Sequence, residues 1–214
     1  AYGVFNSSMA HLRAEKKLIV CGKYMKYTTP YQSVVFMGKI ASGKGTQANL
    51  VLSHFGGVLY SNGNKLREVA QKPTVFGRKM KEVYEDGLLL PEWVASYWMT
   101  HALVSQYADD LIVFEAVAKK PDEAELFHEI HETLGRKYIV FHIDVSDDIV
   151  HERSKARARD IVDAAHSVQT RLEQFALHTA KSIEVFRRHG VLVDLDGSAS
   201  PEDVKAEVFK HLMV

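Results

Sequence analysis

One segment constrains the fold of this chain more than any other, because it is a buried-strand pattern that breaks into a glycine-bracketed loop. Residues 34–47 read Val-Val-Phe-Met-Gly-Lys-Ile-Ala-Ser-Gly-Lys-Gly-Thr-Gln. Glycines at 38 and 43 let the backbone curl so that successive N–H groups face inward, and the helix expected next adds its positive dipole end. The segment therefore predicts a polyphosphate cradle made of Gly38, Ala41, Ser42, Gly43, Lys44, Gly45 and Thr46.

An ordinary glycine-rich turn is the alternative interpretation of this loop. The strand pattern before it and the helical pattern after it favour the cradle. The usual template has Ser or Thr directly after the lysine, whereas here Gly45 separates Lys44 from Thr46. This variant narrows the kinds of phosphate-binding protein that the chain can resemble.

The composition fits one globular domain that binds neither nucleic acid nor a membrane. The chain has 214 residues, 46% hydrophobic and 25% charged, which is enough to bury a full core. Its 27 basic and 27 acidic residues cancel, so no global charge attracts nucleic acid or anionic lipid. The single cysteine excludes an internal disulfide, and no apolar run approaches the roughly 18 residues of a membrane span. We expect a cytoplasmic monomer.

The first 32 residues differ in charge from the rest of the chain. Glu15 is their one acidic residue, and their basic residues are Arg13, Lys16, Lys17, Lys23 and Lys26. A basic targeting arm is one interpretation, but the stretch lacks both an Arg-rich amphipathic pattern and a secretory apolar core. We therefore expect an N-terminal extension without an assigned role over residues 1–32, followed by one domain over residues 33–214.

Strand patterns alternate with helical patterns along this domain. Short apolar or β-branched runs predict strands over residues 33–37, 58–60, 111–115, 138–143 and 191–195. Apolar residues at three-to-four spacing predict helices over residues 47–54, 65–71, 77–85, 91–107, 121–134, 147–158, 164–188 and 201–212. This alternation predicts an α/β fold whose parallel sheet has helices on both faces and binds ligands beyond the carboxyl ends of its strands.

Several separated motifs resemble one family. Gly-Lys-Gly-Thr-Gln at 43–47 resembles the phosphate loop of adenylate kinases and other nucleoside monophosphate kinases. Ser-Asn-Gly-Asn-Lys-Leu-Arg at 61–67 resembles the family's Ser-Thr-Gly-Asp-x-x-Arg, and Gly-Leu-Leu-Leu-Pro at 87–91 resembles its Gly-x-Leu-Val-Pro. Arg153, Arg157, Arg159 and Arg171 follow in the order of the family's lid and post-lid arginines, and residues 194–197 resemble the segment that closes over the ATP base.

The resemblance implies a P-loop NTPase-type three-layer α/β/α fold with a five-stranded parallel sheet in the order 2-3-1-4-5. It implies reversible transfer of the γ-phosphoryl group of MgATP to a nucleoside monophosphate, giving ADP. AMP is the acceptor that the resemblance favours. By the same resemblance, Lys44 holds the β- and γ-phosphates, Arg67 clamps the acceptor α-phosphate, and Arg157, Arg159 and Arg171 surround the transferring group. Arg153 and Gly197 then belong to the ATP site, and Ser61, Asn62, Gly63, Leu90, Lys119 and Glu123 to the acceptor site. Taken singly, each arginine is also compatible with an ordinary surface charge.

The resemblance also divides the domain. Residues 61–92 correspond to the acceptor-binding segment and residues from about 154 to 165 to a mobile lid. Only seventeen residues separate Arg153 from Arg171, without a cysteine quartet for zinc or a β-rich insertion, so the resemblance is to short-lid members. Closing even a short lid over the phosphates excludes water, which limits hydrolysis of ATP.

The chain departs from the family at two groups of positions. Lys39, Ile40 and Ala41 stand where the family has Gly or Pro, so Lys39 either adds charge near the phosphates or narrows the cradle by its bulk. Glu-Ala-Val-Ala-Lys at 115–119 replaces Asp-Gly-(Phe/Tyr)-Pro-Arg. Glu115 can still order Mg²⁺-bound water, because Mg²⁺ keeps several waters. Lys119 can neutralise a phosphate but lacks the guanidinium fork, and Asn64 replaces a family Asp, so we expect slower chemistry.

The acceptor base is the open part of the interpretation. Asn62 and Glu123 occupy the positions of the family's Thr and Gln that recognise adenine. An ionised carboxylate accepts hydrogen bonds but cannot donate them, which suits the N1 and N2 edge of guanine better than adenine. Glu123 therefore shifts the acceptor preference away from AMP, unless it is merely an acid in the first helical turn, favoured by the dipole.

Other candidate features have plainer explanations. His128 and His131 lie at helical spacing without a third ligand, so we interpret them as helix-surface residues. Tyr84, Trp93, Tyr97 and Trp98 are interpreted as core packing for the acceptor-binding segment. Two alternative functions stay open: a nucleotide-binding pseudoenzyme, and a P-loop kinase with another acceptor such as GMP, CMP or UMP.

Overall fold

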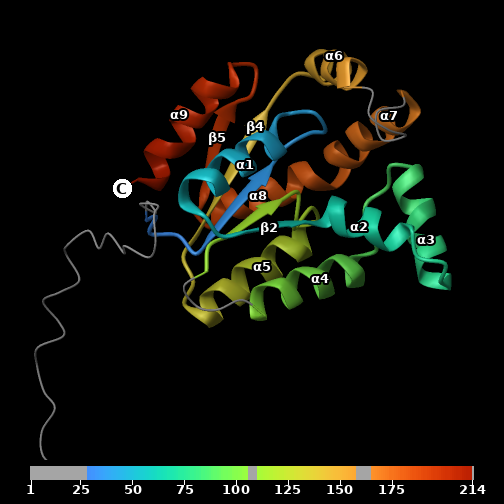
Figure 1. Cartoon of the computed structure of the whole chain (residues 1–214), viewed down its shortest axis with the longest axis horizontal. Coiled ribbons are helices and arrows are strands. Elements are labelled where there is room, and N and C mark those ends of the chain that lie inside the picture. Colours follow the sequence, from blue (N-terminus) through green and yellow to red (C-terminus); the bar gives the residue numbers. More distant parts are fainter. Residues whose placement is uncertain (1–27, 106–109, 158–164, 214) are drawn as a thin grey trace, which may run out of the picture.

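The computed structural model describes residues 28–105, 110–157 and 165–213. Its centre is a sheet of five parallel strands in the order β2-β3-β1-β4-β5 (Figure 1). The strands are β1 (Ser33–Met37), β2 (Val58–Ser61), β3 (Ile112–Glu115), β4 (Tyr138–Asp144) and β5 (Leu192–Asp196). All five predicted strands are therefore confirmed to within a residue at each end, and the strand order matches the one that the family resemblance implies.

Helices follow the strands in the predicted alternation. Their bounds are α1 (Lys44–Phe55), α2 (Asn62–Ala70), α3 (Val75–Glu85), α4 (Glu92–Val104), α5 (Pro121–Leu134), α6 (Asp147–Arg157), α7 (Ala165–Gln174), α8 (Ala180–Arg188) and α9 (Pro201–Leu212). Helix α2 begins three residues earlier than predicted because the Ser61 hydroxyl accepts a hydrogen bond from the Asn64 N–H at 3.3 Å and caps the helix.

The predicted helix over residues 164–188 is not uniform. A π-helical turn, η2 (Phe175–Thr179), separates α7 from α8. The apolar spacing that predicts a helix continues through this turn, so the sequence pattern does not reveal it. A π turn widens the helix locally and re-aims side chains, and such turns are frequent at functional sites.

Helices cover both faces of the sheet, which makes three layers (Figure 1). Successive side chains of a strand point to opposite faces. Val34 of β1 accordingly belongs to an apolar cluster shared with α1 and α9, and Val35 to a cluster shared with α4, α5 and α8. All five residues of β1 are buried, as expected for the middle strand of a covered parallel sheet.

Two smaller apolar clusters lie beyond the sheet. Leu66 of α2, Met80 of α3 and Val94 of α4 form one of them. Val150 of α6 and Leu172 of α7 belong to the other. The helices α2 and α3 thus form a packed hairpin that shares this cluster with α4 and projects from the right of the molecule in Figure 1.

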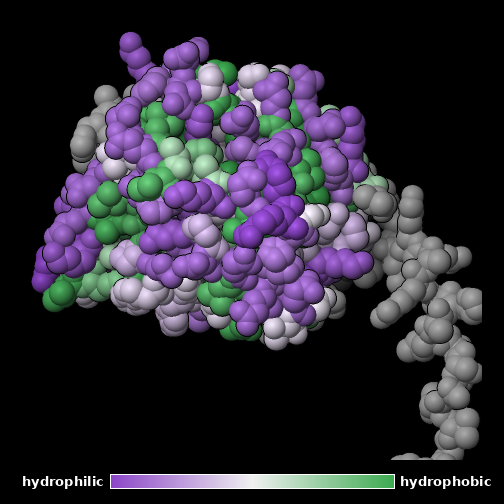
Figure 2. Space-filling view, turned by 180° about the vertical axis from the view of Figure 1, so that it is seen from behind, coloured by the Kyte–Doolittle hydropathy of each residue, from purple (hydrophilic) through white to green (hydrophobic). Residues whose placement is uncertain are grey.

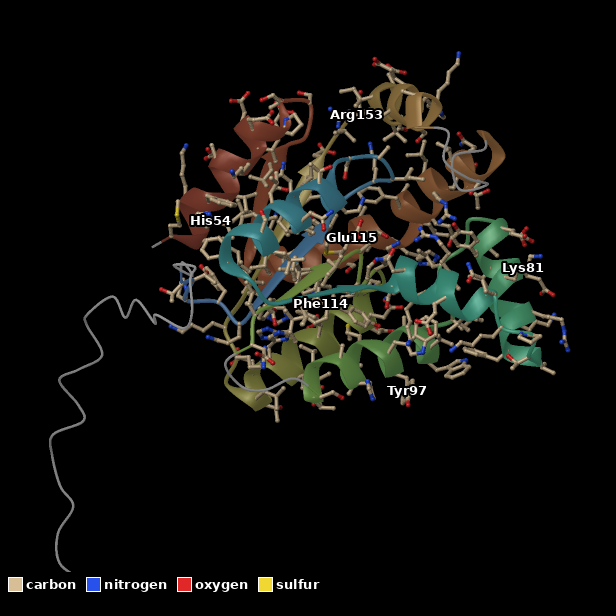
Figure 3. All side chains as sticks on the ribbon, in the orientation of Figure 1. His54, Lys81, Tyr97, Phe114, Glu115 and Arg153 are labelled. Carbon is tan, nitrogen blue, oxygen red and sulfur yellow. The ribbon has the colours of Figure 1, made fainter. Side chains whose placement is uncertain are left out.

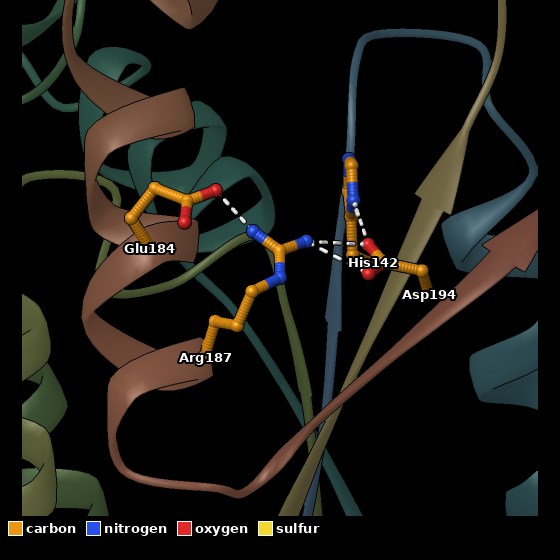
Figure 4. Close-up of polar contacts among 4 residues, drawn as sticks. All are labelled: His142, Glu184, Arg187 and Asp194. Carbon is orange, nitrogen blue, oxygen red and sulfur yellow. Dashed lines mark hydrogen bonds and ion pairs between the residues drawn. The ribbon is translucent and has the colours of Figure 1, made fainter.

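A polar network joins the edge of the sheet to α8 (Figure 4). His142 of β4 contacts Asp194 of β5 through Nδ1 and Oδ1 at 2.8 Å, and Arg187 donates to the other oxygen of Asp194 at 2.7 Å. Arg187 also pairs with Glu184 one turn earlier on α8. The ring of His142 stacks on Phe175, 6.2 Å between centroids, so the network supports the first residue of the π turn.

The outer surface is mainly polar. Figure 2 views the side opposite to Figure 1, where hydrophilic residues predominate and apolar ones form small groups between them. Within the described ranges, no helix combines the length and the apolar character that crossing a bilayer requires.

The strand order places a crevice at the carboxyl ends of the sheet. β1 pairs with β3 on one side and with β4 on the other. The chain therefore leaves β1 at a point where the connections diverge, which is the usual ligand position in an open α/β sheet. The loop over residues 38–43 follows β1 at this point.

Candidate active site

A cavity of about 1130 Å³ occupies this crevice. The loop over residues 38–47 forms one wall. The predicted site residues outside that loop that also line it are Ser61, Gly63, Arg67, Glu115, Lys119, Arg153, Arg171 and Gly197. The structure thus gathers into one cavity residues that the sequence distributes over more than 150 positions.

The loop needs glycine at its first position. Gly38 has φ +142°, and a Cβ there would lie 2.4 Å from the Ile143 carbonyl oxygen. Gly43 has φ +103° and precedes α1, and because it has no side chain to cap that helix, the first helical N–H groups face ligand or solvent. Ala41, where the family has Gly or Pro, also has positive φ, +58°, so it carries a strain that glycine would not.

The two lysines of the loop have different surroundings. Lys44 is buried and donates from Nζ to the Lys39 carbonyl and to the Ser42 hydroxyl, which keeps its charge inside the loop. Lys39 donates to the Val145 carbonyl at 2.8 Å and pairs with Asp147 at 2.7 Å. The ammonium of Lys39 therefore ties the loop to the start of α6, which accounts for a lysine at this position.

Glu115 stands at the end of β3, near the middle of the molecule in Figure 3. Its Oε1 lies 3.2 Å from the position that a Cβ on Gly45 would take. The glycine between Lys44 and Thr46 thus leaves room for this carboxylate beside the first turn of α1. Among the described residues, no group of three or more His, Cys, Asp or Glu could hold a metal by itself. The Thr46 hydroxyl and the Glu115 carboxylate fit a magnesium ion whose other ligands are phosphate oxygens and water.

Two arginines meet at Tyr84. Arg67 donates from Nε to the Tyr84 hydroxyl at 3.2 Å, and its guanidinium lies 5.9 Å from the centroid of that ring. Arg171 donates to the Tyr84 backbone carbonyl at 3.0 Å and to the Ser167 hydroxyl at 3.2 Å. One residue of α3 therefore touches the arginine of α2 and the arginine of α7.

The segment after β3 is strained and partly buried. Ala116 and Ala118 have φ +56° and +50°, in the left-handed region that costs an L-residue roughly 1–2 kcal/mol. Burial, together with the positive charge of Arg171, lowers the pKa of Lys119 to about 8. Its ammonium therefore loses charge above about pH 8.

Glu123 lies at a small second cavity of about 120 Å³, which adjoins the large one. Asn62, Arg67, Tyr84, Leu90, Lys119 and Arg171 line the same space. The Glu123 side chain is buried and accepts a hydrogen bond from the Lys119 N–H at 2.8 Å. Burial raises the pKa of its carboxyl, and the N–H groups of Lys119 and Lys120 oppose that rise.

Arg153 and Gly197 meet on the opposite side of the loop. Arg153 of α6, labelled in Figure 3, donates to the Gly197 carbonyl at 2.9 Å. The Gly197 N–H donates a hydrogen bond to the Asp144 backbone carbonyl at 2.7 Å. A Cβ on Gly197 would lie 2.6 Å from Ile143 Cγ2, so only glycine fits this close approach.

Some predicted residues are not placed in the cavity. Arg159 and most of the lid interpretation, residues 158–164, lie outside the described residues. Arg157 ends α6, and only its backbone is described. Asn62, Leu90 and Glu123 line the small cavity and not the large one.

Three interpretations of aromatic and histidine residues are wrong. Trp93 and Tyr97 are 65% and 62% exposed, because they share the outward face of α4, while Trp98 is buried. His131 is fully buried instead of lying on the surface. It contacts the Phe127 carbonyl through Nδ1 and the Ser33 hydroxyl through Nε2.

The sequence interpretation also missed cavity residues. Tyr84 packs against the apolar cluster of α2, α3 and α4, as interpreted, but it also lines the small cavity and contacts both arginines. Phe175 and Thr179 of the π turn line the large cavity. The sequence offered one signal for Tyr84: it lies three residues before Gly87, the first residue of the motif at 87–91.

Comparison with known proteins gives consistent matches. A family model described as adenylate kinase matches residues 36–191. An adenylate kinase of Kosmotoga olearia is 26% identical, with 84% of this chain and 98% of that protein covered. An adenylate kinase of Caldicellulosiruptor saccharolyticus is 27% identical (85% and 99% covered), and one of Thermus thermophilus is 25% identical (83% and 95% covered).

Proposed function

The chain belongs to the adenylate kinase family, which makes it a phosphotransferase of the nucleoside monophosphate kinase type, and we propose that it transfers the γ-phosphoryl group of MgATP to AMP. The reaction is reversible and gives two molecules of ADP. The bond between the β–γ bridging oxygen and the γ-phosphorus breaks, and a bond from an α-phosphate oxygen of AMP to that phosphorus forms.

One observation carries this proposal. Besides Lys39, which pairs with Asp147, five cationic side chains from five separate parts of the chain line a single cavity: Lys44, Arg67, Lys119, Arg153 and Arg171. Two nucleotides with several negative charges repel each other, so bringing them in line requires positive charge on both. A cavity of about 1130 Å³ with this lining suits two nucleotides end to end.

The position of each cation suggests its task. Lys44 and the N–H groups of residues 42–46 hold the β- and γ-phosphates of ATP. Arg67, and Lys119 as a point charge, hold the α-phosphate of AMP. Arg171, which lines both cavities, stabilises the charge of the transferring group, with Arg157 and Arg159 added from the lid segment. Arg153 and Gly197 border the ATP base.

Magnesium enters through the substrate. When bound, Mg²⁺ would supply positive charge that neutralises the charge developing on the phosphates. The Thr46 hydroxyl and, through water, the Glu115 carboxylate would hold it. The remaining task of the protein is to exclude water, because water that reaches the γ-phosphate hydrolyses ATP.

A nucleotide-binding pseudoenzyme is the second candidate. It is favoured by Ala116, which carries a left-handed conformation where the family has glycine, and by Lys119, which cannot form the bidentate contact of an arginine. Under this candidate the chain binds ATP but turns it over slowly or not at all.

A coupled assay of ADP formation separates the two candidates. The full chain is given ATP with AMP, GMP, CMP or UMP, and Lys44→Met is compared with Lys81→Ala, an exposed position on α3. We expect turnover that Lys44→Met lowers by about 10²–10³-fold, the scale of losing one charge-stabilising group, and that Lys81→Ala leaves unchanged. No turnover with any monophosphate, or equal turnover in Lys44→Met, contradicts the proposal.

A further inference from the structure

The small cavity beside the phosphate-binding cations has an unusual composition. Its wall contains the apolar side chains of Leu66, Leu90 and Ala95 and the carboxyl group of Glu123. Glu123 is only 3% exposed. An apolar slot of about 120 Å³ next to Arg67 and Lys119 suits a flat ring attached to a phosphate held by those cations. A base in this slot meets a carboxyl group.

Glu123 is held in place by the backbone. It is the third residue of α5, and its Oε2 accepts the Lys119 N–H at 2.8 Å. This bond reaches back over the start of the helix, so the helix fixes the orientation of the carboxyl plane. A carboxylate has about four acceptor sites, which leaves capacity for hydrogen bonds from a ligand in the slot.

The protonation state of this carboxyl decides which purine it can pair with. The adenine edge presents an N6 donor beside the N1 acceptor, and the guanine edge presents two adjacent donors, N1–H and N2–H. An ionised carboxylate is acceptor-only and fits two donors. A protonated carboxyl has one donor and one acceptor and fits adenine. The same side chain therefore reads adenine in one state and guanine in the other.

We infer that Glu123 selects the acceptor base through its own proton, taking AMP when the carboxyl is neutral and GMP when it is ionised. This inference rests on the proposed function, because it assigns the base of the phosphoryl acceptor to the small cavity. It gives the site two acceptors whose ratio depends on pH.

The surroundings act on the carboxyl in opposite directions. Burial raises the pKa of Glu123, which moves the change of state toward neutral pH. The cations Lys119 and Lys120 favour the ionised form. Arg67 and Arg171, which line the same cavity, add positive charge, and Tyr84 adds a neutral hydroxyl. The negative charge of Glu115 opposes the lowering of the pKa of the neighbouring Lys119.

The ratio of the two acceptors isolates Glu123 from other ionisations. The phosphate groups of AMP and GMP titrate alike, and loss of charge from Lys119 above about pH 8 weakens both substrates equally. These effects cancel in the ratio of kcat/KM for AMP to kcat/KM for GMP. The remaining pH dependence comes from the proton on Glu123, which AMP binding requires and GMP binding excludes. It changes the ratio by up to about tenfold per pH unit.

The experiment measures this ratio for the full chain from about pH 5.5 to about pH 8. We expect the ratio to fall as the pH rises in the wild-type chain. In Glu123→Gln it should be large and independent of pH, because an amide always offers one donor and one acceptor. Glu129→Gln, an exposed change on the same helix, should keep the wild-type slope.

A flat wild-type ratio, or a slope that survives in Glu123→Gln, overturns the inference. Dissociation constants for AMP and GMP, measured by calorimetry over the same pH range, give the same ratio without turnover. A sloping binding ratio in a chain that turns over neither acceptor contradicts the proposed function and supports the inference. Turnover of either acceptor, with a ratio that does not change with pH, supports the proposed function and contradicts the inference.

Discussion

At the scale of single residues, Tyr84 accounts for how two arginines from different helices are held at one place. Its hydroxyl and ring hold Arg67, and its backbone carbonyl holds Arg171. A guanidinium that is already oriented loses less rotamer freedom when a phosphate arrives. We therefore propose that Tyr84 is a positioning residue for the acceptor phosphate, acting through Arg67.

Tyr84→Phe tests this role because it keeps the ring and the backbone bond but removes the hydroxyl. We expect KM for the acceptor to rise about fivefold, which corresponds to the roughly 1 kcal/mol of one partly exposed hydrogen bond. KM for ATP should stay unchanged. Tyr97→Phe, on the exposed face of α4, is the control for steady-state kinetics. Equal rises in both KM values would show that the hydroxyl supports the fold and not the acceptor site.

At the scale of elements, the hairpin of α2 and α3 is held by a close approach at Gly77. A Cβ at this position would lie 2.1 Å from the Lys72 carbonyl oxygen and 2.9 Å from that of Val69. The Gly77 N–H also donates to the Thr74 hydroxyl at 2.9 Å, which caps α3. Because Arg67 and Tyr84 belong to this hairpin, we expect its packing to set the geometry of the proposed acceptor site.

Gly77→Ala should separate the two substrates. Alanine is the better helix former by about 1 kcal/mol, but here its Cβ forces the turn between α2 and α3 apart, at a cost of about 1–3 kcal/mol. We expect a several-fold higher KM for the acceptor, unchanged KM for ATP and faster amide hydrogen exchange in residues 62–85. Lys81→Ala should change neither KM value nor the rate of amide hydrogen exchange. A Gly77→Ala chain that is indistinguishable from wild type would disprove the close contact.

The elements were predictable to different degrees. All five strands follow from short apolar runs, and the helices from three-to-four spacing, because burial imposes both periods on the sequence. The π turn at Phe175–Thr179 could not be predicted, since one changed hydrogen-bond step leaves the apolar spacing intact. The exposure of Trp93 and Tyr97 was also missed, because composition identifies aromatic residues but not which face of α4 is covered.

At the scale of the whole molecule, buried His131 links the central strand to α5. It contacts Ser33 at the start of β1 and the Phe127 carbonyl at 2.9 and 2.8 Å. Burial, supported by the positive charges of Arg136 and His128, lowers its pKa from 6.5 to about 4. The unfolded chain binds a proton at this residue between these two pH values while the folded chain does not, so folding loses stability as the pH falls through that window.

The free energy of unfolding should therefore drop by up to about 3 kcal/mol from this residue as the pH falls from 6.5 to 4. Urea titrations across this range measure the slope. His131→Gln is expected to be less stable overall but to lose this part of the slope, since an amide does not titrate. His151→Gln, an exposed change on α6, should retain it. A wild-type slope in His131→Gln would mean that other groups cause the acid sensitivity.

The gathering of the site was predictable at this scale, and its internal contacts were not. A parallel sheet brings the loop after β1 and the end of β3 to one edge, so Lys44 and Glu115 had to lie close together. The contacts of Lys39 with Val145 and Asp147 depend on side-chain conformations that no sequence pattern encodes.

The central claim is that this cavity aligns two nucleotides so that a phosphoryl group passes between them without reaching water. It is tested most directly by giving the full chain ATP labelled in the γ-phosphate together with unlabelled AMP, and separating the products. We predict that the label appears in ADP, in equal amount to the ATP consumed. Label that appears only in inorganic phosphate, or that stays in ATP, would contradict the claim.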